Sequence, residues 1–156
     1  MPRIMLVDDD RNVLRSLARL IHFMPVARLR GEALVETFDR PATALQRAAE
    51  VDFDLVIADY LMPTMNGIDF LRRFMDLQPA TPRMMLSGYA NIVEELAGVR
   101  EIEPVEMLAK PWENDALIAA IARTLPRRAV SIRQLFAATP RIPAPAAARY
   151  SQTFTR

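Results

Sequence analysis

The sequence predicts an α/β fold in which helices cover both faces of a parallel sheet. Short apolar runs alternate five times with segments of helical apolar spacing over residues 1–125, a pattern typical of repeated strand–helix units. The chain has 156 residues, of which 51% are hydrophobic and 25% are charged. It is therefore long enough for one domain with a real core but hardly for two. We expect the parallel strands to be joined by right-handed crossovers.

The first two units occupy the N-terminal third of the chain. Arg3–Val7 is an apolar run that leads into three aspartates, which indicates a buried strand. Apolar residues at helical spacing then predict a helix over about 11–24, which the following proline ends. Ala33–Phe38 is the second expected strand. Pro41 begins a helix that extends to about residue 50, because proline is well suited to a first helical turn.

The other three units continue the same alternation. Leu55–Ala58 is expected to be a strand that ends at Asp59, and Pro63 with Asn66-Gly67 marks the loop after it. The later strands are expected at Met84–Leu86 and Val105–Leu108, and the later helices at Ile68–Leu77, about 92–99 and Asp115–Leu125. Each expected strand is thus followed by a helix, as the crossovers of a parallel sheet require.

The chain changes character after residue 125. Residues 1–125 form the expected domain, with 14 basic and 19 acidic side chains. Residues 126–156 form a tail rich in proline, alanine and arginine, with six arginines and no acidic residue. We expect this basic tail to be largely flexible. Apolar residues at helical spacing predict either a short helix near 130–137 or residual hydrophobicity in a disordered segment.

Composition excludes several classes of protein. The chain has no cysteine, which excludes disulfide bridges and thiolate metal sites. It has no apolar run of about 18 residues, so a membrane span is not expected. The N-terminus leads directly into the first strand and lacks the features of a secretory signal peptide. We therefore expect a cytoplasmic protein that makes no contact with a membrane.

Polar side chains end four of the five expected strands. Asp8 and Asp9 follow the first strand, Asp59 the third, Ser87 the fourth and Lys110 the fifth. The carboxyl ends of parallel strands share one edge of the sheet, where the functional residues of open α/β folds gather. Lys110 is the only lysine beside 19 arginines, and these two cations differ in geometry and hydration. The sequence therefore predicts three carboxylates, a hydroxyl and an ammonium in one site.

The residue types at this edge indicate metal-assisted phosphoryl chemistry. Clustered carboxylates repel one another and favour a bound cation. An all-oxygen donor set suits Mg²⁺ better than Zn²⁺. A carboxylate beside Mg²⁺ can attack a phosphoryl donor, while an ammonium and a hydroxyl stabilise the phosphoryl oxygens. A single aspartate at a strand end is more often a loop or helix-capping residue, so the prediction depends on the cluster as a whole.

Four short motifs around these residues stand in a specific order: Val7-Asp8-Asp9, then Asp59-Tyr60-Leu61-Met62-Pro63 with Gly67, then Ser87-Gly88-Tyr89-Ala90, then Lys110-Pro111-Trp112. Together they resemble the CheY-like receiver domains of bacterial two-component response regulators, over about residues 3–125. Each motif is common by itself, whereas the set of four is specific. The resemblance implies a flavodoxin-like (βα)5 fold, with a five-stranded parallel sheet of order 2-1-3-4-5 and helices on both faces.

The resemblance implies a role for each residue of the acidic cluster. Asp59 would be the phosphoacceptor and a ligand of Mg²⁺. Asp9 would bind Mg²⁺ directly and Asp8 largely through water. The backbone carbonyl of Leu61 would be a further ligand. Asp10 is expected to cap the following helix instead.

The resemblance also implies roles around the phosphoryl group. Ser87 would hydrogen-bond it and take part in the switch, and Lys110 would pair with it. Pro111 would follow a cis peptide bond, as in the family. Met107 stands where many receivers have a tyrosine or phenylalanine that swings inward, so we expect the flexible methionine to pack inward on phosphorylation. His22, the only histidine, is expected to be structural, so a phosphohistidine donor must come from another protein.

Two residues are expected to control the loss of the phosphoryl group. Leu61 and Tyr89 occupy the positions that flank the path of a hydrolytic water in the family. Both are bulky and neither is a good base, so we expect slow self-dephosphorylation. Apart from its own phosphorylation and dephosphorylation, the chain is not expected to be an enzyme.

The expected partners are proteins. A sensor histidine kinase or a phosphotransfer protein would supply the phosphoryl group, and a downstream protein target would recognise the switched state. The surface of the fourth helix, fifth strand and fifth helix is expected to carry such contacts, including a phosphorylation-dependent homodimer. The tail is too short for a DNA-binding domain with its own core. Two alternatives stay open: a pseudo-receiver that binds partners without phosphorylation, and a haloacid-dehalogenase-type phosphatase, whose Asp-x-Asp pattern Asp8-Asp9-Asp10 fits formally.

Overall fold

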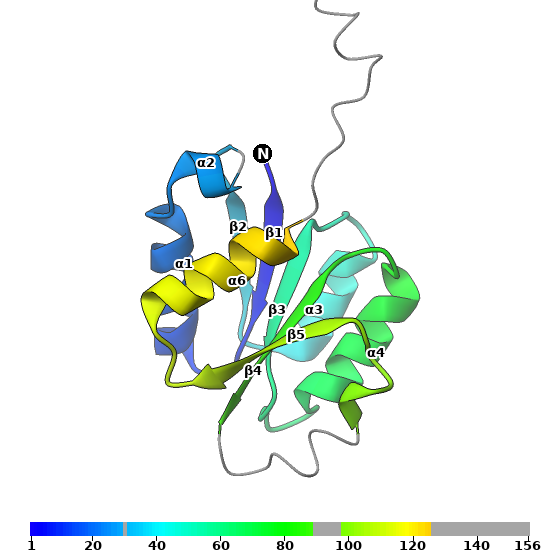
Figure 1. Cartoon of the computed structure of the whole chain (residues 1–156). Coiled ribbons are helices and arrows are strands. Elements are labelled where there is room, and N and C mark those ends of the chain that lie inside the picture. Colours follow the sequence, from blue (N-terminus) through cyan, green and yellow to red (C-terminus); the bar gives the residue numbers. More distant parts are fainter. Residues whose placement is uncertain (30, 89–97, 126–156) are drawn as a thin grey trace, which may run out of the picture. The chain divides into compact units, whose positions relative to one another are not determined.

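The computed structural model describes residues 1–29, 31–88 and 98–125, which form a sheet with helices around it (Figure 1). The strands are β1 (Arg3–Val7), β2 (Leu34–Phe38), β3 (Leu55–Asp59), β4 (Arg83–Gly88) and β5 (Val105–Lys110). The helices are α1 (Arg11–His22), α2 (Val26–Leu29), α3 (Pro41–Ala48), α4 (Gly67–Leu77) and α6 (Asn114–Thr124). All neighbouring strands are parallel and their order is β2-β1-β3-β4-β5, so the predicted fold class and strand order are confirmed.

Each face of the sheet buries its own hydrophobic core. Met5 and Val7 of β1 belong to the cluster that contains α3 and α4, whereas Ile4 and Leu6 belong to the cluster that contains α1 and α6. Figure 1 shows the two helix pairs on opposite sides of the sheet. A strand that is covered on both faces must be apolar at successive positions. This requirement explains the uninterrupted apolar run in β1.

The polar residues at the ends of β4 and β5 belong to the sheet itself. β4 and β5 are longer than expected, because β4 begins at Arg83 and ends at Gly88, and β5 ends at Lys110. Ser87 is paired with Ala109 and Gly88 with Lys110 in the register of the two strands. The backbone of the candidate site is therefore fixed by the strand ladder. α3, α4 and α6 differ from the expected bounds by one or two residues at their ends.

The segment after α1 departs from the prediction. The helix expected over 11–24 ends at His22, and the chain then forms the short helix α2, a turn that no sequence pattern indicated. The N–H of Arg28 donates to the carbonyl of Pro25 (2.8 Å), which closes this turn. Leu29 is buried at its end. The extra turn thus adds one apolar side chain to the core on the α1 face.

Part of the expected structure lies outside the described residues. This applies to most of the helix expected over about 92–99 and to the tail over 126–156 with its expected short helix. Met1–Pro126 form one compact unit. In the described part of the chain, no helix combines the length and the apolar character needed to cross a bilayer.

Candidate functional site

The predicted polar residues meet at the carboxyl edge of the sheet. Asp8 directly follows β1, Asp59 ends β3 and Lys110 ends β5. The Nζ atom of Lys110 lies 2.8 Å from Oδ2 of Asp8 and 2.7 Å from Oδ1 of Asp59. The first of these contacts joins residues that are 102 positions apart in the sequence. The parallel sheet, with its strand ends on one edge, is what brings them together.

A third carboxylate, that of Asp9, lies beside the two that contact this ammonium group. One oxygen from each of Asp8, Asp9 and Asp59 lies within 4.8 Å of the others. Asp8 and Asp59 are 1% and 6% exposed, whereas Asp9 is exposed to solvent. The single charge of Lys110 does not balance three carboxylates, so the cluster favours an additional cation. Its donors are all oxygen atoms, which are the ligands of hard divalent cations.

Burial and charge oppose each other at the two central residues. Burial raises the pKa of Asp59, the hydrogen bond from Lys110 lowers it and the charge of Asp8 raises it, so the pKa lies above its ordinary value. For Lys110, burial lowers the pKa, but the hydrogen bonds to Asp59 and Asp8 outweigh this effect and the pKa is raised. The lysine is thus held as a cation beside carboxylates that are poorly solvated.

Asp10 connects the cluster to α1. Its backbone N–H donates to Oδ1 of Asp8 (2.8 Å), which holds that carboxylate in place. Its own Oδ1 accepts a hydrogen bond from the N–H of Asn12 (2.8 Å). Asp10 is therefore the N-cap of α1, and its predicted capping role is confirmed.

The loop after β3 is held close to the sheet through Gly67. The N–H of Tyr60 donates to the carbonyl of Leu86 (2.8 Å), and the N–H of Gly67 donates to the carbonyl of Tyr60 (2.7 Å). A Cβ atom at position 67 would lie 2.4 Å from the backbone oxygen of Asp59. Only glycine permits so close an approach. This role is not among the predictions from sequence, although the Asn66-Gly67 pair in the loop offers a signal for it.

The other predicted site residues differ in exposure. Ser87 is buried in β4, and its Oγ donates to the carbonyl of the next residue (3.1 Å). Leu61 is 67% exposed in the loop after β3, and Met107 is 37% exposed on β5. The peptide bond before Pro111 is cis, as the resemblance implies. Tyr89, the second residue expected to slow hydrolysis, lies outside the described residues.

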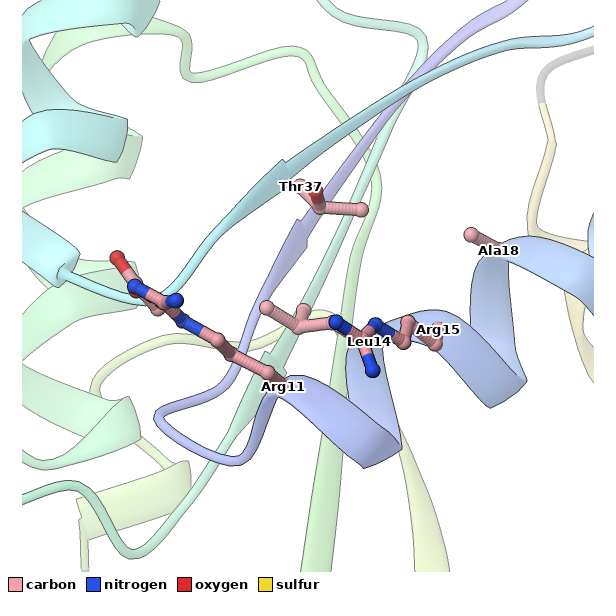
Figure 2. A pocket seen from close by; sticks show the side chains of 6 residues that line it. Arg11, Leu14, Arg15, Ala18 and Thr37 are labelled. Carbon is pink, nitrogen blue, oxygen red and sulfur yellow. Dashed lines mark hydrogen bonds and ion pairs between the residues drawn. The ribbon is translucent and has the colours of Figure 1, made fainter.

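A pocket of about 360 Å³ lies between α1 and β2. Its lining consists of Arg11, Leu14, Arg15, Ala18, Thr37 and Asp39. Figure 2 shows Arg11 and Arg15 projecting from α1 and Thr37 from β2 around this pocket. Nη2 of Arg11 lies 2.6 Å from Oδ2 of Asp39, and this hydrogen bond holds the pKa of the Asp39 carboxyl below its ordinary value. The pocket contains no carboxylate of the acidic cluster, so it is separate from the candidate site.

His22 is exposed at the end of α1. Its ring packs edge-on against Phe23, with the ring centroids 5.5 Å apart. It is not one of the residues that form the acidic cluster. The expectation that a phosphohistidine donor comes from another protein therefore stands as a prediction.

Known proteins that resemble this chain include receivers and transcriptional regulators. A family model described as the response regulator receiver domain matches residues 4–122. The response regulator receiver protein CpdR of Brucella abortus (strain 2308) is 32% identical over 127 residues, which cover 80% of this chain and 98% of CpdR. The transcriptional regulatory protein PrrA of Mycobacterium leprae (strain TN) is 31% identical over 127 residues. That match covers 81% of this chain but only 51% of PrrA, so the chain spans about half the length of this relative.

Solved structures agree with the observed fold. The signal receiver domain of an HD domain-containing protein from Pseudomonas fluorescens Pf-5 is 28% identical, with a TM-score of 0.68. The alignment covers 79% of this chain and 93% of that domain. Neither the phosphatase nor the pseudo-receiver alternative gains support from these matches, and receiver domains are generally signalling domains without enzymatic activity. The matched residues, the strand order and the acidic edge of the sheet agree: the chain belongs to the response regulator receiver domain family.

Proposed function

We propose that this chain is a phosphorylation-controlled receiver in which Asp59 accepts a phosphoryl group from a phosphohistidine of a histidine kinase or phosphotransfer protein. The observation that carries the proposal is the position of Lys110, whose Nζ lies 2.8 Å from Asp8 and 2.7 Å from Asp59. A buried carboxylate beside a fixed ammonium has the two groups that acyl-phosphate formation needs. Membership of the receiver family supports the same assignment.

The transfer is a nucleophilic displacement at phosphorus. A carboxylate oxygen of Asp59 attacks the phosphorus atom, the bond from phosphorus to the imidazole nitrogen breaks, and its electron pair stays with the histidine of the partner. The product is an aspartyl phosphate. Lys110 can move its hydrogen bond from Asp59 to the phosphoryl oxygens, and the hydroxyl of Ser87 can donate a second one. Ser87 is the next-to-last residue of β4, which pairs with β3, and Lys110 ends β5, which pairs with β4, so the backbone holds both residues in place.

The acidic cluster fits Mg²⁺. Asp8, Asp9 and Asp59 supply oxygen donors within 4.8 Å of one another, and we assign the backbone carbonyl of Leu61 as a further ligand. Mg²⁺, when bound, neutralises charge on the phosphoryl oxygens. Asp9 is exposed and is the carboxylate most accessible to an incoming ion. Asp8 is held by the N–H of Asp10, which orients its oxygens before a ligand arrives.

The output of the switch is a change in protein contacts. We assign it to a surface made by β5, α6 and the helix expected over about 92–99, which a downstream target or a second copy of the chain would recognise. Met107 lies on β5, three residues before Lys110, and is 37% exposed. We expect it to become packed on phosphorylation. An unchanged methyl NMR signal of Met107 after phosphorylation would count against this step.

The organisation of the chain is part of the same proposal. Residues 1–125 act as the receiver and residues 126–156 as a basic tail. The location is cytoplasmic, where a histidine kinase and its receiver can meet. Self-dephosphorylation is slow, because Leu61 offers no group that orients a hydrolytic water.

Intact mass spectrometry tests the phosphoacceptor. After incubation with Mg²⁺ and acetyl phosphate, we expect a phosphate-sized mass gain in the wild-type chain and none in Asp59→Asn. Asp76→Asn removes an exposed carboxyl from α4 outside the cluster, so this matched control should gain the same mass. If the wild type forms no adduct and also binds no beryllium fluoride in the presence of Mg²⁺, the proposal is wrong.

A further inference from the structure

A second pocket lies at the other end of the sheet from the acidic cluster. It has a volume of about 520 Å³, and its lining includes Arg83 and Val105, which begin β4 and β5, and Arg123 near the end of α6. β4 and β5 run from this pocket toward Ser87 and Lys110, so the two sites share strands but no residue. The volume is within the range of about 300–1,000 Å³ typical of pockets for small molecules.

Arg83 is the buried charged residue of this pocket. It is only 4% exposed, at the start of a strand whose next four residues are also buried. Its Nε donates to the carbonyl of Ile102 (3.3 Å), and its Nη1 donates to the carbonyls of Pro79 and Thr81 (both 3.2 Å). All three acceptors are neutral. Within residues 1–29, 31–88 and 98–125, no carboxylate forms an ion pair with Arg83.

A buried guanidinium without a counter-charge is an unusual arrangement. Buried charges in proteins are normally paired, because the loss of hydration otherwise costs free energy. Burial lowers the pKa of Arg83, although arginine remains protonated in proteins. Nη2 of Arg83 donates no hydrogen bond to any residue that the structure describes. An oxyanion in the pocket would accept from this donor and balance the charge.

The remaining lining suits one small anion. Arg123 adds a second guanidinium, whose Nη2 binds Oε1 of Glu106 (2.7 Å). Among the described residues that line the pocket, two arginines and one glutamate leave one positive charge without a carboxylate partner. Pro82, Pro104 and Val105 also line the pocket and supply apolar surface for the carbon skeleton of a ligand.

We propose that this pocket binds a small molecule that carries a carboxylate or phosphate group, with Arg83 as the buried cation that holds the oxyanion and Arg123 as a second donor at the rim. Guanidinium groups bind both kinds of oxyanion through paired N–H donors. Separate titrations with a carboxylate and with phosphate therefore distinguish the two classes of ligand. The site requires neither Asp59 nor a metal ion. Anion binding in this pocket is therefore independent of the proposed role of Asp59 as phosphoacceptor.

NMR titration of the ¹⁵N-labelled full chain tests the proposal. Malonate and inorganic phosphate are added separately in the presence of a metal chelator, with sodium chloride at matched ionic strength as the reference. We expect saturable shifts of the amides of Thr81, Arg83 and Val105 with at least one of the two anions, and the same shifts in Asp59→Asn. The anion that binds more tightly identifies the ligand class. Shifts that do not exceed those of chloride with either anion overturn the proposal.

Variants identify the residue that holds the anion. Arg83→Met should weaken binding about tenfold or more, because charge-assisted hydrogen bonds are the strongest that this pocket offers. Arg73→Met removes an exposed arginine of α4 and should leave the affinity unchanged. Arg83→Lys keeps a cation without the paired donors and should also bind more weakly. Unchanged affinity in a folded Arg83 variant overturns the proposal.

One measurement does not depend on how well the variants fold. In the wild-type chain, the side-chain Nε–H signal of Arg83 should shift with the same saturation curve as the pocket amides, because the anion binds the same guanidinium. A signal that stays in place while the amides shift would assign the anion to other residues and overturn the proposal.

Discussion

The Nζ atom of Lys110 lies 2.7 Å from Oδ1 of Asp59, and the same atom lies 2.8 Å from Oδ2 of Asp8. Both carboxylates are buried. Without the lysine, their charges would face each other in an environment that water screens poorly. Stability and the proposed phosphoryl transfer therefore depend on one ammonium group.

Replacement of Lys110 by methionine should lower the free energy of unfolding by about 2 kcal/mol in the absence of metal ions, because two buried charges lose their partner. Mg²⁺ should restore part of the loss by taking the place of the lost cation. Urea denaturation with and without Mg²⁺ measures both effects. Arg73→Met, a change at an exposed arginine of α4, should shift stability by less than about 0.5 kcal/mol. An equal loss of stability in Lys110→Met and Arg73→Met would contradict the role of Lys110 as partner of the two carboxylates.

Gly67→Ala should lower stability by about 1–3 kcal/mol, the usual cost of overpacking. The added Cβ would lie 2.4 Å from the backbone oxygen of Asp59 and 2.9 Å from Cα of Tyr60, and backbone atoms cannot move aside as a flexible side chain can. Phosphorylation by acetyl phosphate should slow in the same variant, since the displaced backbone carries Asp59. Gly88→Ala is the matched control, because a Cβ there meets nothing within 4 Å. Thermal denaturation of both variants tests the prediction, and equal stability of the two variants would contradict it.

Among the polar residues outside the site, Gln78 is expected to be the one whose substitution lowers the stability of the fold most. Its Nε2 donates to the carbonyls of Ala48 (2.7 Å) and Val51 (2.8 Å), and its Oε1 accepts from the N–H of Phe53 (2.9 Å). Gln78→Leu should lower the free energy of unfolding by about 2–4 kcal/mol, because three backbone groups lose their partner. Gln46→Ala, at an exposed position of α3, should be near neutral in the same urea titrations. If Gln78→Leu leaves the free energy of unfolding unchanged, water forms the hydrogen bonds to the three backbone groups in place of the amide.

The ion pair between Arg11 and Asp39 should be visible in acid. The hydrogen bond from Arg11 holds the pKa of Asp39 below its ordinary value of 3.8. A depressed folded-state pKa contributes stability above the unfolded pKa, and this contribution is lost as the pH falls below 3.8 through the folded value. Arg11→Ala should raise the carboxyl pKa measured by NMR. Arg15→Ala, in the same pocket, should change it less, and an equal effect would argue for a general field rather than the pair.

Leu61 should determine how long the aspartyl phosphate lasts. It is 67% exposed in the loop after Asp59 and has no polar group that could orient a water molecule. Leu61→Asn supplies such a group and should speed dephosphorylation several-fold, whereas Leu61→Met should not. The decay of the phosphorylated mass species with time gives both rates. A wild-type lifetime of only seconds would contradict the prediction of slow hydrolysis.

The strands and the acidic edge could be predicted because their signals are local. Each inner strand is apolar at successive positions, which burial on both faces requires, and the alternation with helices places all strand ends on one edge. The positions of Asp8, Asp59 and Lys110 at the strand ends therefore predict that these three residues meet. Their contacts in the folded protein agree with this prediction.

Other features could not be predicted because their causes are not local. α2 is too short to show a periodic pattern. Gln78 acts on backbone groups 25 to 30 positions away, and nothing in its own neighbourhood indicates them. Arg83 looks like a polar end of a strand, and its burial arises from carbonyls such as that of Ile102, 19 positions away.

The capping residue Asp10 has a consequence for motion. Its N–H binds Asp8 and its side chain binds the N–H of Asn12, so one residue ties the acidic cluster to the first turn of α1. A cation that binds Asp8 would therefore act on the same residue that anchors the start of α1. We expect amide hydrogen exchange at Asn12 to change when Mg²⁺ is added.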